Sequence, residues 1–271
     1  MRKLITICLV ATMILVISNV ANAHWDIGQP AKWVQLPDLQ PTGVDVLATH
    51  PKVLADDFLC IKTGPITDIH LWGSWLSDYL PVNSQGQPDA SLVNFRLSIH
   101  SDIPKGPTGS YSTPGNLLWQ QTFNPGQFQT RLYANNLVEG WYNPGTGEYI
   151  PQGDTQVWQY NFFIDPATAF TQQGTATNPT VYWLDVEALP VSIPGTAEPL
   201  FGWKTSLTHW NDDAVWADSS ITPPTGWQEL VYPQRHLYQG QSMDLAFVIT
   251  PEPATICLLS LAALSLIRRK K

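Results

Sequence analysis

The stretch NFRLSIH at residues 94–100 decides the fold class, because apolar and polar residues alternate along it without a break. Successive side chains of a β-strand point to opposite faces, so Phe95, Leu97 and Ile99 are predicted to face a core. The same period of two recurs at 158–164 and at 243–249. These three stretches therefore predict half-buried β-strands.

Short strand-like runs separated by turn residues fill the rest of residues 24–250. Further strands are expected near 54–61, 66–73, 117–123, 127–133, 180–188, 213–217 and 227–232, about ten in all. The segments 101–115, 143–153 and 171–179 are rich in turn-forming Pro, Gly, Thr and Asn, and His24 to about Val44 is expected to form a wrapped arm. The pattern predicts one all-β domain, an antiparallel β-sandwich of jelly-roll type, with an immunoglobulin-like sandwich as the alternative.

The N-terminus has the three parts of a secretory signal peptide. Arg2 and Lys3 form a charged start, residues 4–18 are apolar, and Ala21-Asn22-Ala23 matches the small-residue cleavage pattern. Residues 1–23 are therefore predicted to be removed by signal peptidase, so that the exported chain begins at His24.

The C-terminus, residues 251–271, also has three parts. Pro251-Glu252-Pro253 is followed by an apolar run at 254–267, expected to form a transmembrane helix, and by Arg268-Arg269-Lys270-Lys271. Fourteen residues span only about 21 Å as a helix, which is short of a bilayer core of about 30 Å. This arrangement resembles the PEP-CTERM sorting signal. The resemblance implies cleavage near Pro251 by a membrane-embedded exosortase and release to the cell surface or the exopolysaccharide; a plain membrane anchor is the alternative.

Residues 24–250 resemble an uncharacterised family of β-rich ectodomains that often precede PEP-CTERM signals. The resemblance is carried by LADDFLC at 54–60, GPITDIHLWGSW at 64–75, FGWKTS at 201–206 and WNDDAVW at 210–216. It implies a β-rich fold and an exported location, and it implies no activity.

Charge and cysteine content limit the partners of the exported part. Six of the fourteen Lys and Arg lie in the two terminal segments, so eight remain in 24–250 against twenty-one Asp and Glu. Nucleic acid and anionic lipid are poor partners for such an acidic chain, whereas divalent cations and neutral sugars suit it better. Cys60 is the single cysteine of 24–250, which excludes a disulfide within that part, and it is expected to be a small buried residue.

All twelve tryptophans lie in residues 24–250. An indole offers a flat apolar face that stacks on the C–H face of a sugar and one N–H donor for a hydroxyl. Trp72 and Trp75 at a strand end, and Trp141 and Tyr142 in a Gly-rich loop, are the candidates for exposed carbohydrate-binding residues. Core packing is the alternative, and it is expected for most of the other tryptophans.

Two aspartate pairs are candidate ligands for a metal ion. Asp56-Asp57 interrupt an apolar strand, and Asp212-Asp213 follow Asn211 at the start of another. Calcium accepts six to eight hard oxygen ligands and is the expected ion. The alternative is that these carboxylates are hydrogen-bonded to strand-end amides or paired with Lys204 and Arg96. The scattered histidines and the single cysteine do not suggest zinc.

Catalysis has weaker support in the sequence than binding has. Trp183, Asp185 and Glu187 share one face of a strand, with the two carboxylates about 7 Å apart, and a solvated polar face explains them better than a glycosidase pair. No catalytic residue is predicted. The sequence predicts a non-enzymatic protein of the cell surface or exopolysaccharide matrix that binds carbohydrate; a passive structural protein is the first alternative and a polysaccharide-degrading enzyme the second.

Overall fold

The computed structural model describes residues 24–107, 111–192, 195, 197–220 and 225–250. The predicted signal peptide at 1–23 and the predicted sorting signal at 251–271, with its helix at 254–267, lie outside the described residues. Among the described residues, no helix is long and apolar enough to cross a membrane.

Two large β-sheets build the described domain. The first has the order β1 (Trp33–Gln35), β18 (Phe247–Ile249), β5 (Asp68–Trp75), β14 (Phe201–Ser206), β2 (Val44–Leu47), β9 (Glu139–Asn143) and β10 (Glu148–Asp154). Three further strands branch from this order: β11 (Val157–Phe163) pairs with β5 and with β8 (Phe128–Ala134), and β17 (Asp244–Leu245) pairs with β14. The second has the order β16 (Thr225–Glu229), β15 (Val215–Asp218), β3 (Lys52–Cys60), β13 (Thr180–Pro190), β6 (Val93–Ile103) and β7 (Thr113–Phe123).

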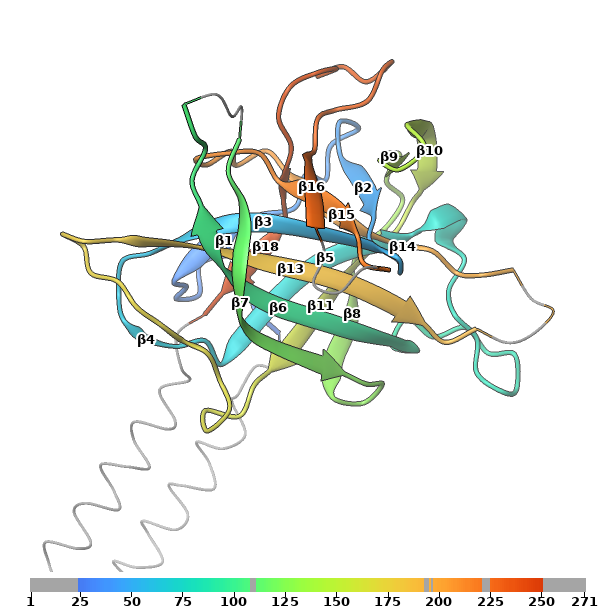
Figure 1. Cartoon of the computed structure of the whole chain (residues 1–271). Coiled ribbons are helices and arrows are strands. Elements are labelled where there is room, and N and C mark those ends of the chain that lie inside the picture. Colours follow the sequence, from blue (N-terminus) through green and yellow to red (C-terminus); the bar gives the residue numbers. More distant parts are fainter. Residues whose placement is uncertain (1–23, 108–110, 193–194, 196, 221–224, 251–271) are drawn as a thin grey trace, which may run out of the picture.

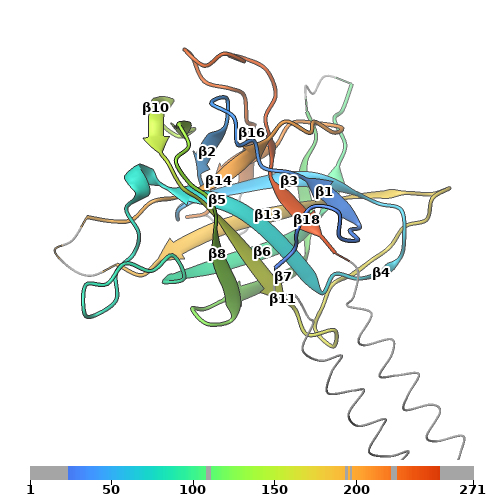
Figure 2. The same ribbon diagram turned by 180° about the vertical axis from the view of Figure 1, so that it is seen from behind.

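Smaller elements join these sheets. β4 (Gly64–Pro65) pairs with β12 (Thr171–Gln172), and a single 3-10 turn, η2 (Leu76–Asp78), follows β5. Almost all strand pairs are antiparallel; β2 and β9 run parallel. In Figure 1, β13, β6 and β7 lie in front of β5, β11 and β8, and the reverse view in Figure 2 shows the opposite order. The domain is therefore all-β, with two sheets stacked face to face.

The core between the sheets follows from the alternation in the sequence. Phe95, Leu97 and Ile99 of β6 are completely buried, as predicted. The Phe95 ring lies 5.1 Å from the ring of Phe201 on β14 and 5.3 Å from that of Phe162 on β11, both in edge-to-face geometry. Since β6 belongs to one sheet and β11 and β14 to the other, aromatic rings join the two sheets directly.

All ten predicted strands are present, and the predicted arm and one predicted loop are corrected. Trp33–Gln35 of the arm adds β1 to the edge of β18. Segment 143–153 is not a loop throughout, because Glu148–Asp154 forms β10, which pairs with β9. Pro151 made this segment look like a loop in the sequence. Because β10 is the last strand of the sheet order, a proline there need not remove a hydrogen bond between strands.

We predict that Phe95→Ala destabilises the domain by about 3–5 kcal/mol, because it removes a ring packed between the sheets and leaves a cavity. Urea unfolding followed by tryptophan fluorescence measures this loss. Phe163→Ala is the matched control, since Phe163 is 40% exposed and should cost far less. Equal losses in the two variants would contradict a core centred on Phe95.

Candidate functional site

The predicted exposure of the candidate tryptophans is wrong. Trp72, Trp75 and Trp141 are 0%, 1% and 2% exposed, and Tyr142 is half-buried. Every residue of β5 is buried because its strand neighbours lie on both sides, and Trp141 lies in β9 rather than in a loop. A sugar cannot stack on these three indoles, so the carbohydrate site does not lie where the sequence placed it.

Three of the four candidate aspartates are held by hydrogen bonds. Asp56 accepts from the Leu245 amide at 2.7 Å and from Gln35 Nε2 at 3.1 Å. Asp57 accepts from the side-chain amide of Asn211, and Asp212 accepts from Ser112 Oγ at 3.0 Å. The alternative of strand-end amide donors therefore describes Asp56, whereas the side chains of Asn211 and Ser112 hold Asp57 and Asp212.

Two predicted partners of these aspartates bind other acids. Lys204 Nζ lies 3.1 Å from Asp45 and 2.8 Å from Glu139, and Arg96 pairs with Glu187. Among the described residues, the one group of three acids close enough together to share a cation is Asp45, Glu139 and Asp154, rather than the four aspartates expected to bind calcium. The geometry thus gives no support to calcium at Asp56, Asp57, Asp212 and Asp213.

The predicted solvated face of β13 is buried. Asp185 is 4% exposed and Glu187 0%, and the two carboxylates have separate partners. Asp185 Oδ2 lies 2.8 Å from His100 Nε2, whereas Glu187 contacts Arg96, His50 and Ser219. Each acid is satisfied in place, so the pair does not face a common substrate position.

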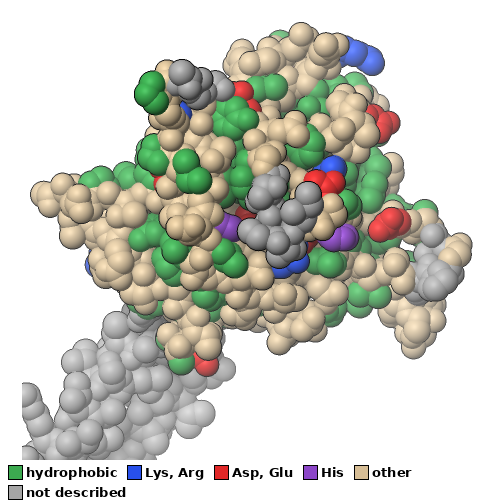
Figure 3. Space-filling model, in the orientation of Figure 1, with side chains coloured by type: hydrophobic (Ala, Val, Ile, Leu, Met, Phe, Trp, Pro, Cys, Tyr) green, Lys and Arg blue, Asp and Glu red, His purple; other side chains and the backbone are tan. Residues whose placement is uncertain are grey.

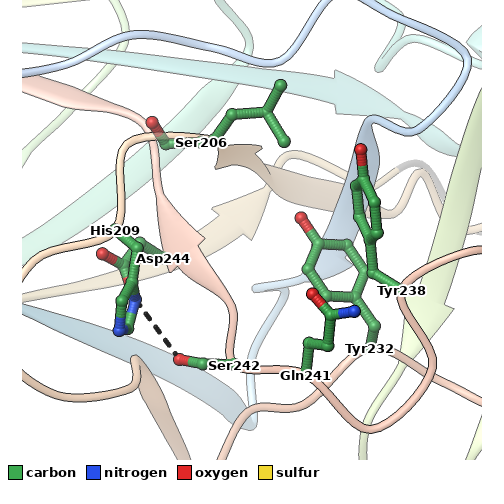
Figure 4. Close-up of a pocket in the computed structure, with 8 residues that line it drawn as sticks. Ser206, His209, Tyr232, Tyr238, Gln241, Ser242 and Asp244 are labelled. Carbon is green, nitrogen blue, oxygen red and sulfur yellow. Dashed lines mark hydrogen bonds and ion pairs between the residues drawn. The ribbon is translucent and has the colours of Figure 1, made fainter.

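An open pocket of about 270 Å³ lies where the end of β14 meets the segment before β17. Figure 4 shows Tyr232, Tyr238 and Gln241 on one wall and His209, Ser242 and Asp244 on the other. The full lining is Ser206, Leu207, His209, Tyr232, Tyr238, Gln241, Ser242 and Asp244. It therefore combines two aromatic rings with several uncharged hydrogen-bonding groups.

The tyrosine wall belongs to the loop 232–241, whose two ends are joined by backbone hydrogen bonds. The Tyr232 amide donates to the Gln241 carbonyl, and the Gly240 amide donates to the Tyr232 carbonyl, each at 2.9 Å. The two rings meet edge to face, 5.5 Å apart. Burial raises the pKa of Tyr232 to about 12, so its phenol remains neutral at physiological pH. The wall presents fixed, neutral aromatic groups.

The opposite wall superficially resembles a catalytic triad. His209 Nδ1 lies 2.9 Å from Asp244 Oδ1 and 3.5 Å from Ser242 Oγ. In a Ser-His-Asp relay, the acid and the serine contact different ring nitrogens, so that one nitrogen is oriented while the other takes the proton. Here both contact the same nitrogen. The arrangement positions His209 and does not activate Ser242.

Acidic groups lie behind this wall. Burial raises the pKa of Asp244 to about 8, and burial together with the neighbouring Asp56 charge raises that of Asp57 to about 9. Burial and a contact with Glu229 raise the pKa of Asp213 to about 8. At neutral pH these carboxyls therefore hold protons, which limits the repulsion among them.

A family model matches residues 31–250, which is most of the chain, and its description is Domain of unknown function (DUF7901). The chain belongs to this family. No curated protein and no solved structure matches it. The DUF7901 domain thus covers both described sheets and the pocket.

The sequence does not reveal the pocket of this DUF7901 domain because its lining comes from two segments, 206–209 and 232–244, that are more than twenty residues apart. One signal was available: Tyr232 and Tyr238 lie in a Pro-, Gln- and Gly-rich stretch between two expected strands. In the structure Tyr232 is part of the core and Tyr238 packs against it. The many tryptophans of the sequence instead favoured Trp72 and Trp75 of β5 as the binding residues.

We predict that the DUF7901 domain becomes less stable as pH rises from 5 to 8. The folded pKa values of Asp57 and Asp244 lie above the ordinary value of 3.8 for an aspartate, so the folded state binds more protons than the unfolded state in this window. Each such group lowers the free energy of unfolding by at most about 1.4 kcal/mol per pH unit. Urea unfolding at pH 5, 6, 7 and 8 measures the slope.

Asp57→Asn keeps the shape of the side chain and removes its titration, so the slope should flatten. Asp165→Asn removes a carboxylate from the exposed surface and controls for the change in net charge. Stability that rises steadily up to pH 8 in the native chain would contradict this prediction.

Proposed function

We propose that this DUF7901 protein is an exported, non-catalytic component of the cell surface or exopolysaccharide matrix, and that it binds a neutral saccharide in the tyrosine pocket. The pocket is the observation that carries the proposal. It offers the half-buried ring of Tyr238 for the C–H face of a sugar, and Gln241, Ser206 and Ser242 for its hydroxyls, while Tyr232, which is 4% exposed and stacked on His236, supports that ring.

The size and chemistry of the pocket favour a small neutral unit of a polymer. A volume of about 270 Å³ suits about one sugar ring, since pockets for larger organic ligands start near 300 Å³. Because the pocket is open to the surface, a sugar bound in it can remain part of a longer polysaccharide. Because Asp244 and Ser242 contact the same nitrogen of His209, the histidine does not activate Ser242, which supports binding without hydrolysis.

Surface charge supports a neutral partner. On the face shown in Figure 3, Lys and Arg side chains are few and scattered among uncharged and apolar groups of the described residues. Nucleic acids and anionic lipids require a concentrated positive surface. A neutral polysaccharide has no such requirement.

The terminal segments support the location. The signal-peptide pattern ending at Ala21-Asn22-Ala23 and the resemblance of Pro251-Glu252-Pro253, the apolar run and Arg268-Arg269 to a PEP-CTERM signal imply signal peptidase and exosortase as processing partners. The jelly-roll assignment of the two sheets also belongs to this proposal. It is supported by the crossings between sheets, for example from β5 to β6 and from β13 to β14.

A passive structural role without a ligand is the second candidate. The burial of Trp72, Trp75 and Trp141 favours it, because these aromatic residues contribute to packing rather than to a surface. The binding experiment below separates the two roles.

We predict that the protein sediments with insoluble or host exopolysaccharide in a saturable manner, and that Tyr238→Ala weakens this binding at least tenfold by removing a stacking face of about 1.4 kcal/mol or more. Tyr79→Ala is the matched control, since Tyr79 is 39% exposed and outside the pocket. Depletion from the supernatant and intrinsic fluorescence give the two readouts.

Equal binding by the two variants would remove the pocket from the proposal. Absence of binding to every polymer in a folded sample would leave the passive role. Binding that disappears with a chelator would point back to calcium at the aspartate pairs.

We predict that the exported chain begins at His24 and that replacing Pro251, Glu252 and Pro253 by alanine retains it in the membrane fraction of a host with exosortase. Edman sequencing and fractionation measure the two results. Glu148→Ala, on the exposed surface, is the control and should be released like the native chain. Release that is unchanged in a strain without exosortase would contradict sorting by this route.

A further inference from the structure

Four buried ionisable residues form a row across neighbouring strands of the first sheet. Lys204 of β14 is the direct cross-strand partner of Asp45 on β2, β2 pairs with β9, and Glu139 of β9 is the cross-strand partner of Asp154 on β10. Lys204, Asp45 and Glu139 are 0% exposed and Asp154 is 3% exposed. The saccharide proposal uses none of these groups.

The lysine amine is held against two carboxyls. Its Nζ lies 3.1 Å from Asp45 Oδ2 in a hydrogen bond and 2.8 Å from Glu139 Oε1. A Cβ atom on Gly43 would lie 2.7 Å from this Nζ and 2.4 Å from the Asp38 carbonyl oxygen, so the glycine lets the backbone close over the amine. The amine therefore has few alternative positions.

The third acid, Asp154, has no hydrogen-bond partner for either carboxyl oxygen among the described residues. A carboxyl oxygen of Asp154 nevertheless lies within 4.8 Å of one from each of Asp45 and Glu139. Burial raises the pKa of Asp154 to about 10 and that of Glu139 to about 7. At neutral pH the cluster thus contains a neutral carboxylic acid and a second carboxyl able to exchange a proton.

An ion pair in this position is costly. Buried charges lose their hydration, and their mutual attraction often fails to repay that loss. Condensation of an ammonium and a carboxylate to an amide removes both charges from the interior. Fixed proximity of two reacting groups corresponds to an effective concentration of about 10⁵–10⁸ M.

We propose that Lys204 and Asp45 form an intramolecular isopeptide bond, with Glu139 as the proton carrier. Glu139 takes a proton from the ammonium, Asp154 lends its proton to the Asp45 carboxylate, and the free amine attacks Cγ of Asp45 to form the C–N bond. Asp154 then takes back a proton from the attached nitrogen, and Glu139 returns its proton to a hydroxyl group on Cγ, which leaves as water. One ammonium and one carboxylate give one amide and one water, so no oxidant or other reactant is needed.

Glu139 is the proton carrier rather than the acceptor of the amine because its Oε1 lies 2.8 Å from Nζ, within reach of the ammonium proton, and burial raises its pKa to about 7, which suits proton exchange at neutral pH. The bond to Asp45 joins residues 159 positions apart. It would constrain the unfolded chain as a disulfide does. The described residues contain no disulfide, because Cys60 is their single cysteine and is free.

Tryptic peptide mapping of the full denatured chain tests this proposal. The bond blocks cleavage after Lys204 and is expected to give one branched peptide joining 33–52 to 132–235, lighter than its separate parts by one water, about 18 Da. Cleavage after Arg131 in the same digest shows that the trypsin is active. Separate, unmodified peptides ending at Lys204 would overturn the proposal. This test uses the native chain and requires no variant.

Variants then test the roles of the residues. Glu139→Gln should leave the peptides unlinked, because the proton carrier is worth about 100-fold or more in rate. Asp45→Asn should still link, with loss of ammonia, about 17 Da, in place of water, whereas Lys204→Met should not link. Linking of Glu139→Gln to the extent seen in the native chain, or a bond from Lys204 to Glu139, would overturn the assignment.

Discussion

The contact of Phe95 with rings from the opposite sheet is the interaction on which the rest of the structure depends. Phe95 on β6 contacts Phe128, Tyr160, Phe162 and Phe201, which come from three strands of the other sheet. These contacts fix the separation and angle of the sheets. The segments that line the pocket leave the ends of strands placed by this packing, so the pocket depends on the core although it lies at the surface.

Burial of charge is the second constraint. A domain with so many acids and so few bases buries carboxyls at the edges of its core, and it does so in two ways. Around Asp57 and Asp244, protons and amide donors neutralise the acids. Around Asp45, a buried lysine does so. The first solution links stability to pH, and the second brings an amine and a carboxyl into reacting distance.

Much of the fold was predictable, because period-two patterns depend only on side chains that alternate between core and surface. The stretches at 94–100, 158–164 and 243–249 were found in this way. Strand β10 was missed because its proline and its glycine are typical of turns. Strand β14 has no alternation because all six of its residues are buried, including Lys204.

Less of the candidate site was predictable. Composition identified aromatic residues as important but did not separate the indoles that pack in the sheets from the tyrosines that line a pocket. That separation depends on which strands become central and which loops fold back, and both follow from long-range pairing. Similarly, Asp45, Glu139, Asp154 and Lys204 carry no common motif, and the strand order alone brings them together.

The central claim is that a saccharide occupies the tyrosine pocket. Two-dimensional amide NMR during titration with fragments of the host exopolysaccharide tests this claim most directly. Saturable shifts concentrated at Ser206–His209 and Tyr232–Asp244 are the predicted result. Shifts centred on other surface aromatic residues, such as Trp119 or Trp216, or no shifts with any fragment, would contradict it.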